Sequence, residues 1–182
     1  LIVATLTSRF VFPLISLEGR RIWILGMAPL TFRQLLWQKF WLSVSLTSFF
    51  TVGLALLSGL MLKLDPLYYA LTVYSVFVSN LGLSGLAVGL GALYPSFDED
   101  NPARIVSGMG GTLNLLSSVA FVVCMVSIQV LVLQWKALGL YRDDVHLYGT
   151  LAVAVTIITG LGVLCAWLPM RLGLRNLNTM EL

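Results

Sequence analysis

Charged side chains are scarce in this sequence. They make up 10% of the 182 residues, whereas globular domains usually contain about 25%. Four long stretches contain none at all, namely residues 40–62, 66–97, 105–135 and 147–170. Each is at least as long as the ~20 apolar residues that a helix needs to cross a bilayer. A soluble domain of this size has too little polar surface to cover so much apolar helix. The sequence therefore predicts an all-α fold, a polytopic transmembrane helical bundle.

Residues that usually carry catalysis or bind metals are also few. Cys124 and Cys165 both lie inside uncharged stretches, so we expect no disulfide framework. His146 is the single histidine and has no second histidine or cysteine close to it in the sequence, although metal sites gather such ligands. No acidic residue lies inside a predicted span, which disfavours a proton relay or an intramembrane enzyme. We expect no enzymatic activity, no metal and no cofactor in this chain.

Two further partner classes are disfavoured by what the chain lacks. It contains no Gly-x-x-x-x-Gly-Lys phosphate loop, so it is not expected to bind ATP by that route. The net charge is +3, but the basic residues lie mostly at the ends of predicted spans. They form no basic stripe interleaved with base-stacking aromatics, so we expect no nucleic acid partner. The expected surroundings are the lipid bilayer.

We expect one transmembrane domain over residues 1–182, with about five spans. Residues 1–16 correspond to the end of a truncated first span. Further spans are predicted at residues 40–62, 66–94, 102–134 and 147–168. The chain starts at Leu1 inside an apolar run, without an initiator Met. We therefore expect it to be the C-terminal portion of a longer protein.

Residues 17–39, called the elbow below, differ from the spans because they mix charged side chains with large apolar ones. Such a mixture is typical of a segment that lies along the membrane face. Gly26 and Pro29 interrupt it. Thr31 and Gln34 have the spacing of a capping box. We expect a helix to begin at Thr31 and to run into the next span.

Proline residues mark other predicted helix ends. Asp65-Pro66 and Asn101-Pro102 each place a capping residue before a proline at the first helical position. The connection before Pro66 is so short that the two flanking spans must form a tight antiparallel hairpin. We expect the helix that begins at Pro102 to run unbroken to residue 134. Pro169 is expected to end the last span, because proline breaks helical hydrogen bonding.

Three glycines lie in the second half of the span 66–94. Gly82, Gly85 and Gly89 are spaced at i, i+3 and i+7. Small residues let helix backbones approach closely in lipid, where no hydrophobic force drives association. We interpret these glycines as helix-packing residues. A gating hinge is the alternative.

The distribution of basic residues predicts the orientation in the membrane. Cytoplasmic loops carry an excess of Lys and Arg. With Arg9 set aside, alternating spans place seven basic residues on one side and three on the other. We therefore expect loops 17–39 and 95–104 and the C-terminus to be cytoplasmic. The seven are Arg20, Arg21, Arg33, Lys39, Arg104, Arg171 and Arg175, and the three are Lys63, Lys136 and Arg142.

The elbow sequence resembles a known family. Residues 16–21 read SLEGRR, residues 24–31 read ILGMAPLT and residues 33–39 read RQLLWQK. This pattern is similar to the membrane-facing elbow of ATP-binding-cassette (ABC) type-2 exporter permeases. Residues 97–108, FDEDNPARIVSG, resemble a bacterial branch of ABC exporter permease subunits. The resemblance covers residues 8–169, and its most specific parts are the elbow and the Asn-Pro-Ala-Arg segment.

The resemblance implies a membrane-spanning permease subunit with about six spans per unit, in the bacterial inner membrane. In such permeases a short cytoplasmic coupling helix contacts a separate ATPase subunit, which binds the ATP and Mg. That role would fall to residues 17–30, with Glu18, Arg20 and Arg21 as the contacts. The alternative is that these three charges only mark the membrane surface. A second permease unit, identical or different, is also implied.

The resemblance suggests two further features. The acidic loop and the arginine after it, Asp98, Glu99, Asp100 and Arg104, are candidates for a secondary contact with the ATPase, although a solvated turn explains them as well. Residues 129–146 are the candidate for a re-entrant element before the final span.

The alternative function is a membrane scaffold or assembly subunit that transports nothing. The sequence does not name a substrate.

Overall fold

The computed structural model describes residues 2–17, 31–63, 65–97, 99, 101–137 and 144–179. In these ranges the regular structure is entirely helical, so the predicted all-α bundle is confirmed. A short N-terminal segment combines α1 (Ile2–Leu6), a π-helix η1 (Thr7–Val11) and a 3-10 helix η2 (Phe12–Leu14). It is followed by α3 (Phe32–Met61), α4 (Pro66–Leu93), α5 (Pro102–Ser107), α6 (Met109–Ala137) and α7 (Asp144–Thr179).

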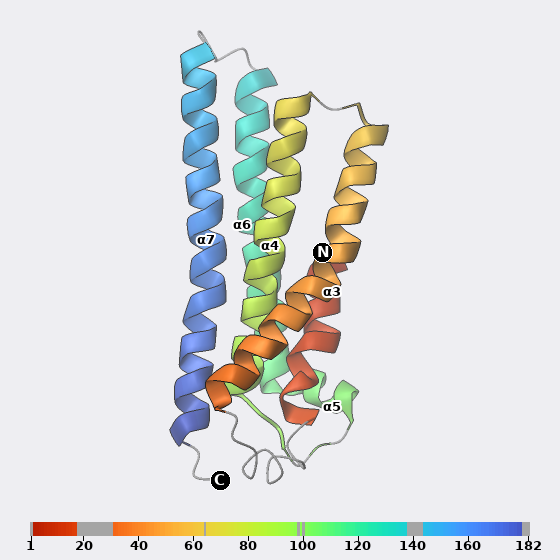
Figure 1. The fold of residues 1–182 in the computed structure, drawn as a ribbon, viewed down its shortest axis with the longest axis vertical. Helices are drawn as coiled ribbons and strands as arrows, with labels where there is room; N and C mark the ends of the chain where they lie inside the picture. The colour runs from red at the N-terminus through yellow and green to blue at the C-terminus, as the bar shows by residue number, and fades with distance from the viewer. Residues whose placement is uncertain are drawn as a thin grey trace.

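Four of these helices, α3, α4, α6 and α7, are long and apolar enough to cross a membrane. They alternate in direction along the bundle, as the predicted topology requires (Figure 1). The N-terminal apolar segment, Val3–Leu14, is shorter than a full span. The protein is therefore a membrane-embedded helical bundle.

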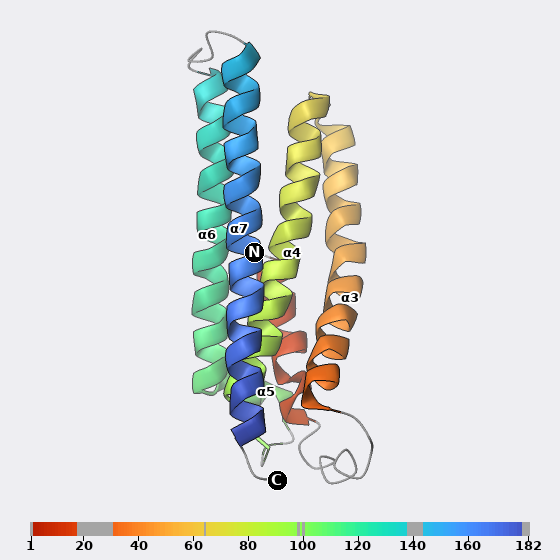
Figure 2. The same ribbon diagram turned by 60° about the vertical axis from the view of Figure 1, so that its left-hand side comes forward.

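Helix α4 lies at the centre of the bundle (Figure 2). It packs against α3, α6 and α7 as well as the N-terminal segment. In the most apolar part of α4, 67% of the residues are buried, whereas 22–28% are buried in the corresponding parts of the other three long helices. The glycine-rich helix is thus the one that the others surround. Its small residues lie where backbones must come close.

We call one end of the bundle the loop end. There α3 and α6 begin and α4 and α7 end, and α5 lies at the same end beside the N-terminal segment (bottom of Figure 1). The connection between α3 and α4 lies at the opposite end. The cytoplasmic orientation of the loop end stays a prediction.

The predicted capping box at the start of α3 is confirmed. The Gln34 backbone N–H donates to Thr31 Oγ1 at 3.4 Å, and the Thr31 backbone N–H donates to Gln34 Oε1 at 3.0 Å. The helix then continues without a break to Met61. Residues 31–39 of the predicted elbow are therefore the first turns of a membrane helix. Residues 18–30 of the elbow lie outside the described residues.

The α3–α4 hairpin is as tight as predicted, but its cap differs. Pro66 begins α4 and Asp65 is the N-cap residue by position, yet the Asp65 side chain makes no capping hydrogen bond. Lys63 turns the chain with a φ of 49°, in the left-handed region that few side chains adopt. The Tyr69 hydroxyl donates to the Leu56 carbonyl at 3.2 Å. This bond joins the two helices close to the turn.

The prediction that Pro169 ends the last helix is wrong. Pro169 lies inside α7, which continues to Thr179. Proline removes one helical hydrogen bond, but membrane helices tolerate this loss where neighbouring helices pack against the site. Gly89 of α4 lies directly against the Pro169 backbone. The extension beyond Pro169 also buries Leu177, which is 2% exposed.

The prediction of one unbroken helix from Pro102 is also wrong. Helix α5 ends at Ser107, and Gly108 is extended with a ψ of 176° before α6 begins. The start of α6 lies so close to the backbone of α5 that a Cβ on Gly111 would overlap the Val106 carbonyl. Only a glycine at position 111 permits this approach. The predicted start at Asn101 and Pro102 is confirmed.

The predicted re-entrant element is not found in the described part of residues 129–146. Residues 129–137 continue α6 as regular helix, and residues 144–146 already belong to α7. The intervening positions, 138–143, lie outside the described residues.

Candidate functional site

The predicted coupling residues Glu18, Arg20 and Arg21 lie outside the described residues, as do Asp98 and Asp100. The structure does describe both ends of the coupling segment. Its entry is attached at Ser16 and its exit is the capped Thr31. The candidate site therefore consists of the residues that hold these two ends.

The entry is attached to the connection that follows α4. The Ser96 backbone N–H donates to Ser16 Oγ at 3.1 Å, and Ser16 itself is buried. Phe12, one turn earlier, is 1% exposed. A Cβ on Gly91 would lie 2.6 Å from the Phe12 carbonyl oxygen, so α4 touches the backbone of η2. The segment that leads into residues 17–30 is thus held against the central helix.

A single apolar cluster underlies this region at the loop end. It joins residues from the N-terminal segment and from α3, α4, α5 and α7 into one core. Elements far apart in the chain therefore meet immediately next to the coupling segment, and close packing makes such a base stiff. Its buried members are Val11, Phe12, Ile15, Leu36, Ala87, Val88, Ala92, Ile105 and Leu177.

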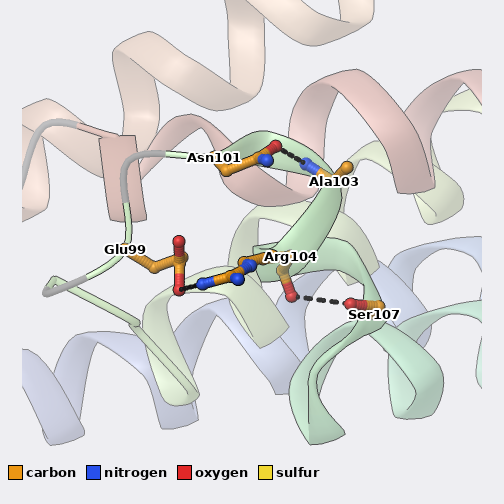
Figure 3. Close-up of polar contacts among 5 residues, drawn as sticks. All are labelled: Glu99, Asn101, Ala103, Arg104 and Ser107. Carbon is orange, nitrogen blue, oxygen red and sulfur yellow. Dashed lines mark hydrogen bonds and ion pairs between the residues drawn. The ribbon is translucent and has the colours of Figure 1, made fainter.

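The acidic loop forms a local, exposed network (Figure 3). Arg104 Nη1 lies 3.4 Å from Glu99 Oε2, with the two side chains 73% and 36% exposed. Asn101 Oδ1 accepts the Ala103 backbone N–H at 3.0 Å, and Ser107 Oγ donates to the Arg104 carbonyl at 3.0 Å. An exposed ion pair contributes at most about 1 kcal/mol. Both charged side chains remain accessible to a partner.

Gly85 and Gly89 of α4 lie against the backbone of α7. A Cβ on Gly85 would overlap the Cα of Ala166 and lie 2.6 Å from its Cβ. A Cβ on Gly89 would lie 2.5 Å from the Met170 backbone nitrogen. Neither position has room for a side chain. The two helices therefore touch backbone to backbone over at least one turn.

Gly82 makes a different contact. A Cβ there would lie 2.6 Å from Cζ of Phe121, the far end of a side chain of α6. Helix α7 contributes small residues of its own, which the sequence reading did not single out. A Cβ on Gly173 would lie 2.6 Å from the Gly89 carbonyl oxygen, and Gly162 lies against Val78. The sequence does contain a pattern that indicates this contact, because Gly162 and Ala166 have small-xxx-small spacing.

Polar side chains join α3 to α4 inside the bundle. Asn80 is fully buried. Its Oδ1 accepts from Thr47 Oγ1 at 2.6 Å and its Nδ2 donates to Ser48 Oγ at 2.5 Å. Ser43 Oγ donates to Ser84 Oγ at 3.1 Å. These contacts hold the α3–α4 pair in register.

Asn176 makes an interhelical contact that the sequence did not predict. Its Nδ2 donates to the carbonyl oxygens of Leu93 at 2.9 Å and Ala92 at 3.4 Å. These are among the last carbonyls of α4, which have no partner within their own helix. The contact escaped prediction because α7 was expected to end before it.

Two buried polar residues of α6 stand apart. Asn114 and Ser118 are both 0% exposed. Their side-chain nitrogen and oxygen atoms have no hydrogen-bond partner among the described residues. In the same ranges no three His, Cys, Asp or Glu side chains lie close enough together to hold a metal ion.

Residues 1–182 match the model of a protein family whose description reads "Putative ATP-binding cassette". The chain belongs to this family. A search of curated proteins and a search of solved structures each found no match. The family and the four apolar helices together describe a membrane-embedded, ABC-related component.

Proposed function

We propose that this chain is the membrane-spanning permease part of an ABC exporter. In this proposal a separate ATPase subunit hydrolyses ATP, and the helical bundle converts that work into movement of a substrate across the membrane. The observation that carries the proposal is the family match over the whole chain, combined with four membrane-length helices.

The ATP-binding function named by the family is assigned to a partner chain. The sequence contains no phosphate loop, and ABC ATPases bind nucleotide through such a loop at a helix N-terminus. Long apolar helices that lie in lipid do not provide a water-exposed site for a nucleotide. A membrane component of an ABC system that lacks this loop is expected to depend on an ATPase for energy.

The loop end is the surface proposed to receive the ATPase. The described chain stops at Leu17 and resumes at Thr31, where α3 begins at this end. Glu18, Arg20 and Arg21, between these two positions, are the proposed contacts. The packed base between Phe12 and Leu177 supports a lever role, because a force applied to residues 17–30 would be passed to α3, α4 and α7 together. Glu99 and Arg104 are the proposed secondary contact. By the positive-inside rule this end faces the cytoplasm.

The test uses the complete natural protein, produced together with a candidate ABC ATPase subunit and reconstituted in liposomes. Glu18, Arg20 and Arg21 are replaced together by Gln. We expect the complex to lose most of its ATPase stimulation while the membrane part stays assembled. The matched control is Lys63→Gln, which removes a charge at the opposite end of the bundle and should leave stimulation unchanged.

The alternative is a scaffold subunit that packs against other membrane proteins without transport, and the glycine contacts of α4 suit it equally well. The experiment separates the two. If the complete protein binds no ATPase and supports no ATP-dependent movement of any cargo, the permease proposal fails. Unchanged ATPase stimulation in the triple variant would instead leave the permease role and overturn the assignment of its contacts.

A further inference from the structure

A groove of about 610 Å³ runs along the outside of the bundle between α3, α4 and α7. Its walls are mostly apolar, and several of them face outward. Val163 is 59% exposed and Trp167 is 53% exposed, while Trp37 and Phe77 are each 42% exposed. In a membrane-embedded bundle such side chains face lipid. The groove is therefore open to the hydrocarbon phase.

The chemistry of the groove changes along its length. Arg33 and Arg171 line it at the loop end, next to Trp37 and Trp167. The Arg171 guanidinium lies 4.9 Å from the centre of the Trp167 ring. Neither arginine forms an ion pair with any carboxylate in the described ranges. Among the residues that the structure describes, two cations thus lie at one mouth of an apolar groove without a counter-charge there.

The opposite end of the groove is weakly polar and uncharged. The Tyr74 hydroxyl and Thr159 Oγ1 lie 2.7 Å apart there, within hydrogen-bond distance. Thr159 precedes Arg171 by twelve residues, which is about 18 Å of helix at about 1.5 Å per residue. Half of a bilayer's hydrocarbon core is about 15 Å thick. The groove therefore covers roughly one leaflet, with its charged end at the headgroup level.

We propose that this groove binds an anionic phospholipid. Its phosphate is held by Arg33 and Arg171, and an acyl chain lies along the apolar wall past Val163 toward Tyr74. Guanidinium groups form charge-assisted hydrogen bonds to phosphate. Tryptophans are enriched at the depth where headgroup meets hydrocarbon, and basic clusters there attract acidic lipids. The proposal stands whether or not the chain transports a cargo.

A lipid fits this groove better than a second copy of the chain does. A helix from a second copy would come from the uncharged stretches, which contain no acidic residue to offer. Such a span would cover the two arginines and remove their water without a counter-charge of its own, which is costly. An anionic lipid supplies the negative charge and the apolar chain in one molecule.

The test measures lipid bound to the purified complete protein in detergent by native mass spectrometry. The probes are phosphatidylglycerol, phosphatidylcholine with the same acyl chains, and inorganic phosphate. We expect phosphatidylglycerol to bind about tenfold more tightly than phosphatidylcholine, a factor equal to about 1.4 kcal/mol. Higher salt should weaken that preference. Inorganic phosphate should compete only weakly, because it lacks the acyl chain.

Two pairs of variants locate the site. The double variant Arg33→Gln/Arg171→Gln should lose about tenfold in phosphatidylglycerol affinity. Arg175→Gln is its control, since Arg175 is exposed one turn later on α7 but does not line the groove. Val163→Trp should block the groove and reduce binding of both lipids. Leu164→Trp is its control, because Leu164 is 55% exposed and lies outside the groove.

Clear results would overturn the proposal. Equal affinity for the two phospholipids, or an unchanged affinity in the double arginine variant, would rule out headgroup recognition by Arg33 and Arg171. If Val163→Trp breaks a dimer and leaves lipid binding intact, the groove is an interface between copies. If the arginine variant does not fold, the salt dependence and the Val163→Trp and Leu164→Trp pair still decide the question.

Discussion

Replacing Gly85 with alanine is expected to force α4 and α7 apart. The new Cβ would lie 2.6 Å from the Ala166 Cβ and would overlap the Ala166 Cα. Carbon atoms in ordinary contact are about 3.5–4.0 Å apart. The helices must therefore separate by about 1 Å, because the obstacle is backbone and cannot rotate away. Overpacking of this kind usually costs about 1–3 kcal/mol.

The comparison with Gly160→Ala isolates this cost. Gly160 also lies in α7, and a Cβ there would meet nothing within 4 Å. Both substitutions gain up to about 1 kcal/mol of helix propensity, so this gain cancels in the difference. We expect Gly85→Ala to be less stable than Gly160→Ala by about 1–3 kcal/mol. The free energy of unfolding can be measured in mixed micelles by titration with sodium dodecyl sulfate.

A rescue experiment makes the reasoning sharper. Adding Ala166→Gly to Gly85→Ala removes the Cβ clash but leaves the Cα overlap, so recovery should be partial. Gly82→Ala meets only the ring edge of Phe121, and Phe121→Leu should restore most of its smaller loss. Equal stability of Gly85→Ala and Gly160→Ala would refute the backbone contact between α4 and α7.

Four further predictions concern the polar contacts and the topology. Asn80→Ala should lower the free energy of unfolding by about 0.6–1.7 kcal/mol, the range for interhelical hydrogen bonds in membranes; no change in the same titration would mean that its bonds to α3 are not formed. Asn176→Ala should cost about 1 kcal/mol by leaving carbonyls of α4 unpaired, and hydrogen exchange should increase at the last turn of that helix. Asn101→Ala should cost about 1 kcal/mol as a lost cap, whereas Glu99→Gln should change stability by less than about 0.5 kcal/mol; the reverse order would contradict the assignment. A cysteine placed at Arg20 should react with a membrane-impermeant maleimide only after cells are opened, and labelling of intact cells would reverse the predicted orientation.

Features set by short stretches of chain were predictable from the sequence. The capping box at Thr31 and the helix starts at Pro66 and Pro102 depend only on residues within one turn of the chain. Nothing distant is needed for them to form. The same holds for the hairpin after Met61, because so short a connection leaves two apolar helices no choice but to run antiparallel.

Most of the features that the sequence did not predict depend on contacts between distant segments. Pro169 stays inside α7 because Gly89 packs against it, and these residues are 80 positions apart. The break at Gly108 is the exception, because the close contact beside it joins Val106 and Gly111, which are only five positions apart. The groove with Arg33 and Arg171 joins three helices, so no local pattern indicates it.

The sequence by itself determined that this protein is an α-helical membrane bundle, because hydrocarbon excludes charge and each uncharged stretch is long enough to cross a bilayer. It also determined that α4 would come close to other helices, because its glycines carry no side chain. Only the tertiary structure decided which backbones those glycines touch, where α7 ends, and which two arginines share one groove. Those outcomes depend on contacts between distant segments, which become favourable only when the whole bundle is packed.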